Sequence, residues 1–225
     1  MPQPDPPKRA TASAKVVVME AAFLAESRSL ARMPVAGPPE IAIAGRSNVG
    51  KSTLLNRLAA RKGLAHVSKT PGRTRGLVVF DLVVRLPDVS AAEPLRLVDL
   101  PGYGYAKVSR DERQAWQEMV EGYIKGRANL VLLLVLVDAR RGLAQEELQL
   151  MSWLQDLAIP CCLVVTKSDK LGAAERGALR HALRQQAKDI VASLFMVSGE
   201  TGEGVDALWA GMAAALEARR ERRER

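Results

Sequence analysis

Short apolar runs alternate with amphipathic stretches along most of this chain. Apolar runs with little alternation are typical of strands buried on both faces of a sheet, and strand-like runs occupy residues 41–44, 77–86, 95–98, 130–137, 161–166 and 194–198. Apolar side chains recur at helical spacing in residues 51–61, 111–125, 146–157, 173–189 and 205–219. This alternation predicts a three-layer α/β domain with a mostly parallel sheet.

The two ends of the chain depart from this pattern. Residues 1–14 are rich in Pro, Ala and charge, and we expect a disordered tail there. Residues 15–31 combine a β-like Val run with a helix-like stretch, and we expect them to pack on the domain as a lead-in element. The sequence therefore predicts one domain over 15–216, with a core of alternating strands and helices from about residue 40, and an Arg-rich tail over 217–225.

Composition narrows the class of protein. The chain has 225 residues, 48% hydrophobic and 26% charged, which is typical of a soluble globular domain. The longest apolar run, 130–137, has eight residues, whereas a membrane-spanning helix needs about 20, so we expect no membrane partner. Cys161 and Cys162 are adjacent in an apolar run, which argues against a disulfide or zinc site and favours the cytoplasm.

Positive charge is concentrated in one part of the chain. The net charge is +8, and residues 45–80 alone carry eight Lys and Arg with no Asp or Glu. Such a stretch favours a phosphate-rich ligand, nucleic acid or both, although Lys and Arg also simply solvate exposed helix faces.

A glycine-rich segment follows the strand-like run 41–44. It reads Gly45-Arg46-Ser47-Asn48-Val49-Gly50-Lys51-Ser52 and precedes a predicted helix. This is the G-x-x-x-x-G-K-S pattern, in which backbone N–H groups and a helix N-terminus bind phosphate. Lys51 would bind the β- and γ-phosphates, and Ser52 would bind Mg²⁺.

An acidic turn follows the strand-like run 95–98. It reads Asp99-Leu100-Pro101-Gly102. An acid at a strand end can hold Mg²⁺ through water, and the Gly102 amide can meet a γ-phosphate and so sense its loss. Any Asp-Pro-Gly turn resembles this pattern, but its place after the phosphate loop favours the nucleotide role.

A third motif follows the buried run 161–166. It reads Thr166-Lys167-Ser168-Asp169 and matches the [NT]-K-x-D guanine pattern. Asp169 can accept hydrogen bonds from guanine N1–H and its 2-amino group, donors that adenine lacks. The Lys167 stem would lie over the base. The alternative is a helix N-cap at Ser168 or Asp169.

Two weaker signals complete the predicted site. Val197-Ser198-Gly199 ends the last strand-like run, where a small residue would let a backbone amide approach guanine O6. Residues 69–76 lie between the first two motifs, and on chemistry alone both Thr70 and Thr74 are candidate Mg²⁺ ligands.

Three segments together resemble the EngB (YihA/YsxC) family of bacterial GTP-binding proteins. They are the phosphate loop, residues 68–74 (SKTPGRT) and residues 98–106 (VDLPGYGYA). The resemblance covers about residues 15–216. It implies a Ras-like P-loop GTPase fold, hydrolysis of GTP to GDP with Mg²⁺, a role in large ribosomal subunit assembly, and a requirement in cell division and septation.

The resemblance also implies roles for individual residues. The direct Mg²⁺ ligands would be Ser52 and Thr74, in preference to Thr70, with Asp99 binding through water. Lys51, Thr74 and Gly102 would be catalytic. The remaining residues implied to flank the nucleotide are Gly72, Arg73, Arg75 and Gly76, besides the motifs already given.

The chain departs from the family pattern at three positions. Gly199 replaces the usual Ser or Ala, and Arg75 stands where the family often has Gln. Tyr103 follows Gly102, at the place of the water-orienting Gln of Ras-type enzymes. We therefore expect slow intrinsic hydrolysis, unless another group or the ribosome assists; Tyr103 could equally be a packing residue.

Other functions compete with a GTPase switch. A P-loop ATPase or small-molecule kinase would share the phosphate loop, but the 166–169 motif argues against it. A nucleotide-dependent RNA-binding module with negligible turnover is compatible with Tyr103. Asn48 is a candidate K⁺ ligand whose cation would neutralise transition-state charge, or it only braces the loop.

The partners we expect are GTP or GDP, the large ribosomal subunit and its RNA, with the chain itself a monomer. Arg57, Arg61 and Lys62 lie in the first predicted helix and at its end, and we expect them to remain exposed and to contact ribosomal RNA. The alternative docking sites are residues 107–113 and the Arg-rich C-terminal end.

Overall fold

The computed structural model describes residues 15–65, 76–87, 89, 91–103, 110–188, 190–191 and 193–224. Its strands are β1 (Val17–Ser27), β2 (Glu40–Gly45), β3 (Leu77–Arg85), β4 (Glu93–Asp99), β5 (Leu130–Asp138), β6 (Cys161–Thr166) and β7 (Ser193–Met196). Its α-helices are α1 (Lys51–Leu58), α2 (Arg110–Gly126), α3 (Gln145–Asp156), α4 (Ala173–Ala187) and α5 (Val205–Glu224). Short 3₁₀ turns are η1 (Leu30–Arg32) and η2 (Ser168–Lys170).

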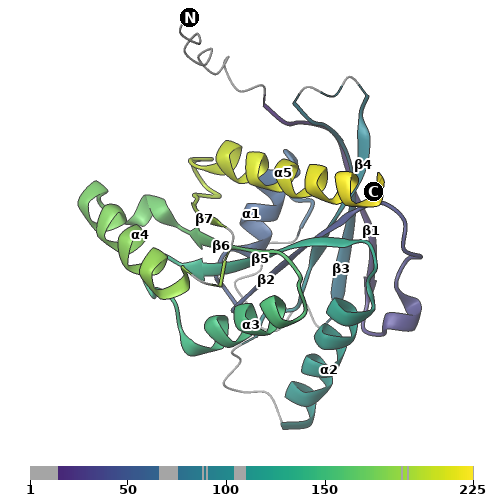
Figure 1. Cartoon of the computed structure of the whole chain (residues 1–225), viewed down its shortest axis with the longest axis horizontal. Coiled ribbons are helices and arrows are strands. Elements are labelled where there is room, and N and C mark those ends of the chain that lie inside the picture. Colours follow the sequence, from purple (N-terminus) through teal and green to yellow (C-terminus); the bar gives the residue numbers. More distant parts are fainter. Residues whose placement is uncertain are drawn as a thin grey trace, which may run out of the picture.

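One mixed sheet forms the centre of the molecule (Figure 1). Its strand order is β1-β3-β4-β2-β5-β6-β7. The strands from β4 to β7 pair in parallel, whereas β3 pairs antiparallel with both β1 and β4. The predicted α/β domain with a mostly parallel sheet is therefore confirmed.

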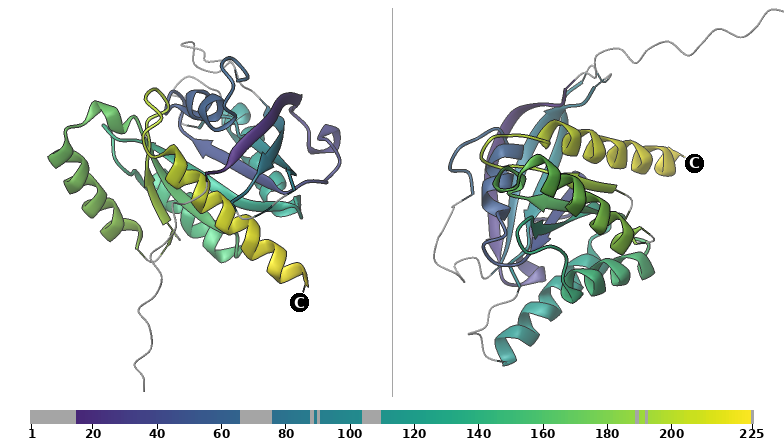
Figure 2. Two further views of the ribbon diagram at one scale, coloured as in Figure 1. Left: turned by 90° about the horizontal axis from the view of Figure 1, so that it is seen from above. Right: turned by 90° about the vertical axis from the view of Figure 1, so that its left-hand side faces the viewer.

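Helices cover both faces of the sheet, as the two turned views show (Figure 2). Leu54 and Leu55 of α1 pack with Trp209 of α5 in the apolar core on one face. Tyr123 of α2 and Met151 of α3 lie in the core on the other face, together with residues of α4. All six residues of β2 are buried between these layers, which explains its continuous apolar sequence.

The lead-in element is a strand, so the helix-like interpretation of residues 15–31 was wrong. β1 runs antiparallel to β3 for 11 residues, and only the three residues of η1 are helical. Phe23 stacks edge-on against Phe80 of β3, with 6.1 Å between ring centroids. Pairing with β3, 50 to 70 residues away in sequence, overrides the local helical signal, as tertiary context often does.

The Arg-rich end continues the last helix. α5 reaches Glu224, so residues 217–224, expected as a tail, form its final turns. Arg219 donates to the backbone oxygens of Ala128 at 3.1 Å and Leu130 at 3.4 Å, and Arg220 forms an ion pair with Glu93. These contacts hold the end of α5 against the starts of β4 and β5.

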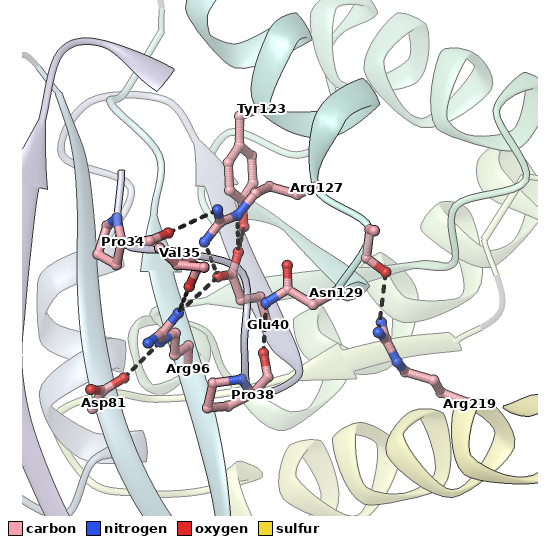
Figure 3. Close-up of polar contacts among 11 residues, drawn as sticks. Pro34, Val35, Pro38, Glu40, Asp81, Arg96, Tyr123, Arg127, Asn129 and Arg219 are labelled. Carbon is pink, nitrogen blue, oxygen red and sulfur yellow. Dashed lines mark hydrogen bonds and ion pairs between the residues drawn. The ribbon is translucent and has the colours of Figure 1, made fainter. Parts of the chain in front are cut away.

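A cluster of polar side chains surrounds the buried N-terminal end of the central strand β2 (Figure 3). The Glu40 side chain is fully buried and accepts hydrogen bonds from Tyr123 at 2.9 Å and from Arg127 Nε at 3.0 Å. Arg127 also donates to Pro34 O, and Arg96 lies 3.8 Å from Glu40. The C-terminal end of α2 is thus anchored to the central strand at the opposite end from the phosphate loop.

No helix within the described residues is both long enough and apolar enough to cross a bilayer.

Candidate nucleotide-binding site

The phosphate loop, residues 45–52, joins the carboxyl end of β2 to the first turn of α1. Its backbone is left-handed at Asn48, with φ of 60°, and at Gly50, with φ of 111°. Asn tolerates this conformation better than most residues. A Cβ on Gly45 would lie 2.9 Å from Val49 Cγ1 and 3.0 Å from Leu136 Cβ. The loop therefore packs tightly and leads directly into the N-terminus of α1, the kind of position at which helices bind phosphate.

Two opposite charges are buried beside this loop. Lys51 Nζ donates to Gly45 O at 3.2 Å, and burial lowers the pKa of Lys51 although Asp99 opposes this. Burial also raises the pKa of Asp99 to about 6, against the attraction of Lys51. Asp99 Oδ1 is buried without a hydrogen-bond partner among the described residues. Such an oxygen, with the Ser52 hydroxyl in the first turn of α1, fits the hard oxygen ligands that Mg²⁺ prefers.

The acidic turn lies against the phosphate loop. Leu100 N donates to Ile43 O at 2.9 Å, and Ser47 N donates to Tyr103 O at 3.1 Å. Gly102 is so close that a Cβ there would lie 2.8 Å from Lys51 Nζ and 3.0 Å from Ser47 N. Only glycine fits here without a shift, so residues 100–103 lie in direct contact with the phosphate loop.

Tyr103 points away from the phosphate loop toward α3. Its hydroxyl donates to Glu147 Oε1 at 2.9 Å, and Glu147 Oε2 accepts from Ala144 N at 3.0 Å. Burial and then the Glu147 charge raise the pKa of Tyr103. The neighbouring Arg46 forms an ion pair with Glu146. This geometry supports Tyr103 as a packing residue, and Glu147, which is 1% exposed, is a partner that the sequence did not indicate.

Two side chains of the 166–169 motif form hydrogen bonds with backbone oxygens of the phosphate loop. Thr166 Oγ1 lies 2.6 Å from Val49 O, and Lys167 Nζ donates to Asn48 O at 2.7 Å. Lys167 Nζ also lies 2.8 Å from Asp138 Oδ2. Lys167 has a left-handed backbone conformation, with φ of 57°, and its side chain extends toward the phosphate loop. The motif expected to hold the base is thus bonded to the segment expected to hold the phosphates.

Asp169 lies in the 3₁₀ turn after β6. A hydrogen bond from the Ser198 hydroxyl is the main cause that lowers the pKa of Asp169, and Lys170 forms an ion pair with it at 3.1 Å. The alternative of a helix N-cap at Ser168 or Asp169 is wrong, because α4 begins at Ala173 with Gly172 at its cap.

Residues 197–199 lie beside this turn. Ser168 N donates to Val197 O at 3.2 Å, and the Ser198 hydroxyl accepts from Thr201 N at 3.0 Å. A Cβ on Gly199 would lie 2.9 Å from Thr53 Cγ2 of α1. The close approach of this turn to α1 gives a physical reason for glycine at the position where the family usually has Ser or Ala.

A cavity of about 290 Å³ opens between the phosphate loop, the end of β5 and the start of α3. Asn48, Asp138, Arg140, Glu147 and Lys167 are among its lining residues. Arg140 donates to both carboxylate oxygens of Asp138, at 3.0 and 2.7 Å. Neither Asp138 nor Arg140 was predicted from the sequence; an acid at the end of a buried strand was the available signal.

Four predicted site residues lie outside the described residues: Gly72, Arg73, Thr74 and Arg75. Thr70, residues 107–109 and the Ser68–Lys69 pair lie outside them too, so the second expected Mg²⁺ ligand stays a prediction. Gly76 is described, and a Cβ there would lie 2.6 Å from Ser27 O of β1.

The predicted RNA-binding face has other contacts. Arg57 Nε donates to Gly199 O at 3.0 Å and its NH2 donates to Glu200 O. Arg61 NH1 donates to Ala21 O of β1. Arg57, Arg61 and Lys62 are all exposed, as expected, and the guanidinium groups of the two arginines also hold backbone oxygens of the fold. Their contact with ribosomal RNA stays a prediction.

Comparisons with known proteins agree with this geometry. A family model described as 50S ribosome-binding GTPase matches residues 40–167. The probable GTP-binding protein EngB of Pelotomaculum thermopropionicum is 46% identical over 191 residues, which cover 83% of this chain and 90% of that protein. The protein of the same description from Anaeromyxobacter sp. (strain Fw109-5) is 40% identical over 200 residues, covering 89% and 93%.

Solved structures share the fold. Era of Aquifex aeolicus bound to GDP and AlF₄⁻ superposes with a TM-score of 0.63 at 26% identity. The match covers 77% of this chain but 55% of that longer chain. A probable GTP-binding protein EngB superposes with a TM-score of 0.60 at 22% identity, covering 80% and 99%. With 40–46% identity to curated relatives over more than four fifths of its length, the chain belongs to the EngB family of GTP-binding proteins and is a P-loop GTPase.

Proposed function

We propose that this GTPase is a nucleotide-operated switch that acts in assembly of the large ribosomal subunit, and that normal cell division and septation depend on it. The single observation that carries the switch is the contact of residues 100–103 with the phosphate loop. Gly102 lies against Lys51 and Ser47, where a γ-phosphate and its loss would act on the same segment.

Mg²⁺ is the proposed cofactor, because the oxygens present suit it. Ser52 and Thr74 would bind the ion directly and Asp99 through water, as the buried Asp99 Oδ1, which has no partner among the described residues, supports. When bound, the ion supplies positive charge that neutralises the triphosphate. Lys51 binds the β- and γ-phosphates, and the Gly102 amide donates to the γ-phosphate.

Hydrolysis by the isolated protein should be slow. Tyr103 occupies the position of the water-orienting Gln, and its hydroxyl is bonded to Glu147 on α3. The chain therefore needs another group to accelerate the reaction, and K⁺ held by Asn48 is the candidate. The left-handed backbone at Asn48 is an independent reason for Asn at this position. Only a comparison of hydrolysis rates in K⁺ and Na⁺ therefore separates a K⁺ ligand from a residue that merely suits the loop conformation.

Specificity for the base is assigned to Asp169. The 166–169 motif and the hydrogen bond from Ser198 support a carboxylate beside the turn at 197–199. A carboxylate suits the N1–H and 2-amino donors of guanine and has no such partners on adenine. This argues against an ATPase or a small-molecule kinase.

The proposed ribosomal partner is supported by the family description, 50S ribosome-binding GTPase, and by the positive charge of the chain. Arg57 and Arg61 are engaged within the fold, so the C-terminal end of α5 is the better candidate face. Arg222 and Arg223 are exposed there. Besides burial, their charges lower the pKa of Arg219, a sign of concentrated positive potential.

Co-sedimentation with purified ribosomal subunits tests this proposal. The protein should pellet with 50S and not with 30S subunits, and more strongly with a non-hydrolysable GTP analogue than with GDP. Affinity should fall with salt, and replacing Arg222 and Arg223 by Gln should flatten the slope by roughly 0.7–0.9 for each phosphate that these arginines neutralise. Equal pelleting with both nucleotides would contradict the switch, and an unchanged slope would exclude this face.

A nucleotide-dependent RNA-binding module with negligible turnover is the second candidate, favoured by the Tyr103–Glu147 hydrogen bond. Single-turnover hydrolysis with and without 50S subunits separates the two. Acceleration by 50S subunits supports the switch, whereas binding without turnover under both conditions supports the module.

A further inference from the structure

Arg57 connects two parts of the nucleotide site that are far apart in sequence. It lies in the last turn of α1, the helix whose first turn carries Lys51 and Ser52. Its guanidinium donates to Gly199 O at 3.0 Å and to Glu200 O, 142 and 143 residues away. Because the fork of a guanidinium has fixed geometry, two such bonds set both the distance and the orientation of the turn.

The turn is seated along one face of α1. Thr53 and Arg57 are four residues apart, so they lie on the same side of the helix. Thr53 Cγ2 would be 2.9 Å from a Cβ on Gly199, and Arg57 Cζ would be 3.7 Å from a Cβ on Gly202. Gly202 is itself left-handed, with φ of 86°. Because Gly199 and Gly202 have no side chains, the backbone of the turn can pack directly against α1 beside the Arg57 guanidinium.

The same turn carries a group that touches the base-reading carboxylate. Ser168 N, next to Asp169, donates to Val197 O at 3.2 Å, so the two turns are bonded to each other. Ser198 precedes Gly199 and is the main cause that lowers the pKa of Asp169. Ser198 is fully buried, and its backbone N donates to Glu203 O at 2.9 Å. A shift of the turn away from α1 would therefore move Ser198 relative to Asp169.

We propose that Arg57 is a positioning residue for guanine recognition: it holds the 199–202 turn on α1 so that Ser198, Asp169 and the amides of the turn are in place for the base. This inference rests on the proposed guanine role of Asp169. Arg57 lies at the opposite end of α1 from Lys51 and Ser52 and acts through the turn, so its loss should weaken base binding and spare phosphate binding.

The experiment measures release of a fluorescent N-methylanthraniloyl-GDP from the isolated protein, without ribosomes. Arg57→Gln should raise the dissociation rate by about tenfold or more, since it removes two hydrogen bonds from a charged donor. Arg57→Lys keeps the charge but loses the fork, and its rate should lie between those of wild type and Arg57→Gln. The affinity for Mg²⁺-pyrophosphate, measured by competition, should change less than about twofold.

Arg61→Gln is the matched control. Arg61 is also an exposed arginine that donates to a backbone oxygen, but that oxygen belongs to Ala21 of β1. Its loss should lower the melting temperature and leave the GDP dissociation rate near that of wild type. If Arg57 had a purely structural role, Arg57→Gln and Arg61→Gln would both lower the melting temperature and have similar GDP dissociation rates.

Three outcomes would overturn the inference. One is an unchanged GDP dissociation rate in both Arg57 variants. Another is an equal loss of pyrophosphate and GDP affinity, which would show general damage to the site; Arg57→Lys provides this comparison if Arg57→Gln does not fold. Wild-type protein that does not prefer GDP to ADP would overturn the guanine site itself, whereas normal preference with unchanged release overturns only the role of Arg57.

Discussion

Lys167 Nζ donates a hydrogen bond to the backbone oxygen of Asn48 at 2.7 Å, across 119 residues of sequence. The lysine of the guanine motif is therefore part of the support of the phosphate loop. The same ammonium contacts Asp138, whose pKa is held low by hydrogen bonds from Arg140 and Lys167 even though burial raises it. The segments predicted to hold the base and the phosphates are thus joined through this one side chain.

Replacing Lys167 by Met tests whether this connection between the two segments supports nucleotide binding. The variant keeps the aliphatic stem but loses the bonds to Asn48 and Asp138. GTP and GDP affinities should fall together by about 1.5–3 kcal/mol, the usual range for a hydrogen bond to a charged group. Equilibrium titration measures both, with Lys188→Met beyond the end of α4 as control. Affinities within twofold of wild type would show that the bond does not support the site.

The hydroxyl of Tyr103 should matter for stability more than for chemistry. Tyr103→Phe takes a donor from the buried Glu147 carboxylate, which keeps its hydrogen bond from Ala144 N. We expect a loss of about 1–3 kcal/mol in the free energy of unfolding, as for a buried acceptor that loses a donor. Urea denaturation gives this value, and single-turnover assays should give a hydrolysis rate within about threefold of wild type. A hundredfold slower reaction would instead place the hydroxyl in catalysis.

Because Gly102 lies so close to the phosphate loop, a substitution there should affect the affinity for GTP more than the affinity for GDP. In Gly102→Ala the new Cβ would lie 3.0 Å from Ser47 N and 3.2 Å from Ser47 Cα, and backbone atoms cannot move aside as a lysine tip can. We expect affinity for a non-hydrolysable GTP analogue to fall by about tenfold, or 1.4 kcal/mol, with little change for GDP. Equal losses for both nucleotides would argue against a γ-phosphate contact at Gly102.

Potassium should accelerate hydrolysis if Asn48 holds the ion. Rates in KCl should exceed those in NaCl at equal ionic strength, and Asn48→Ala should remove the difference. Asn48→Gly is the informative control, because it relaxes the left-handed backbone at φ of 60° and still lacks the side-chain oxygen. Identical rates in both salts, with and without ribosomes, would leave Asn48 with a purely conformational role.

Periodicity and motifs predicted the architecture because both are local signals. The run Cys161–Thr166 was predicted with the observed bounds, since a short, continuous, largely apolar run is typical of a strand buried on both faces. The strand–loop–helix setting of residues 41–58 follows equally directly from the Gly pattern. β1 was missed in part because its strand character comes from pairing with β3, which no window of sequence contains.

The partners of side chains could not be predicted in the same way. Arg57 and Arg61 were expected to face ribosomal RNA, but both also donate to backbone oxygens of the fold, and backbone oxygens carry no residue-type signal. Glu147 lies in the predicted helix 146–157, but nothing in that pattern indicates that its carboxylate accepts a hydrogen bond from Tyr103, 44 residues earlier in the chain. Contacts of this kind depend on how the layers are stacked, not on the spacing within one element.

The central claim is that one carboxylate, Asp169, makes this site specific for guanine. Competition binding of GTP, GDP, ATP and XTP to wild type and Asp169→Asn tests it most directly. Wild type should bind GTP and GDP and exclude ATP and XTP. The variant should lose about 2–4 kcal/mol for GTP and GDP and gain XTP, because xanthine offers an acceptor where guanine offers its 2-amino donor. Unchanged GTP affinity in the variant, or ATP binding equal to GTP in wild type, would contradict the account.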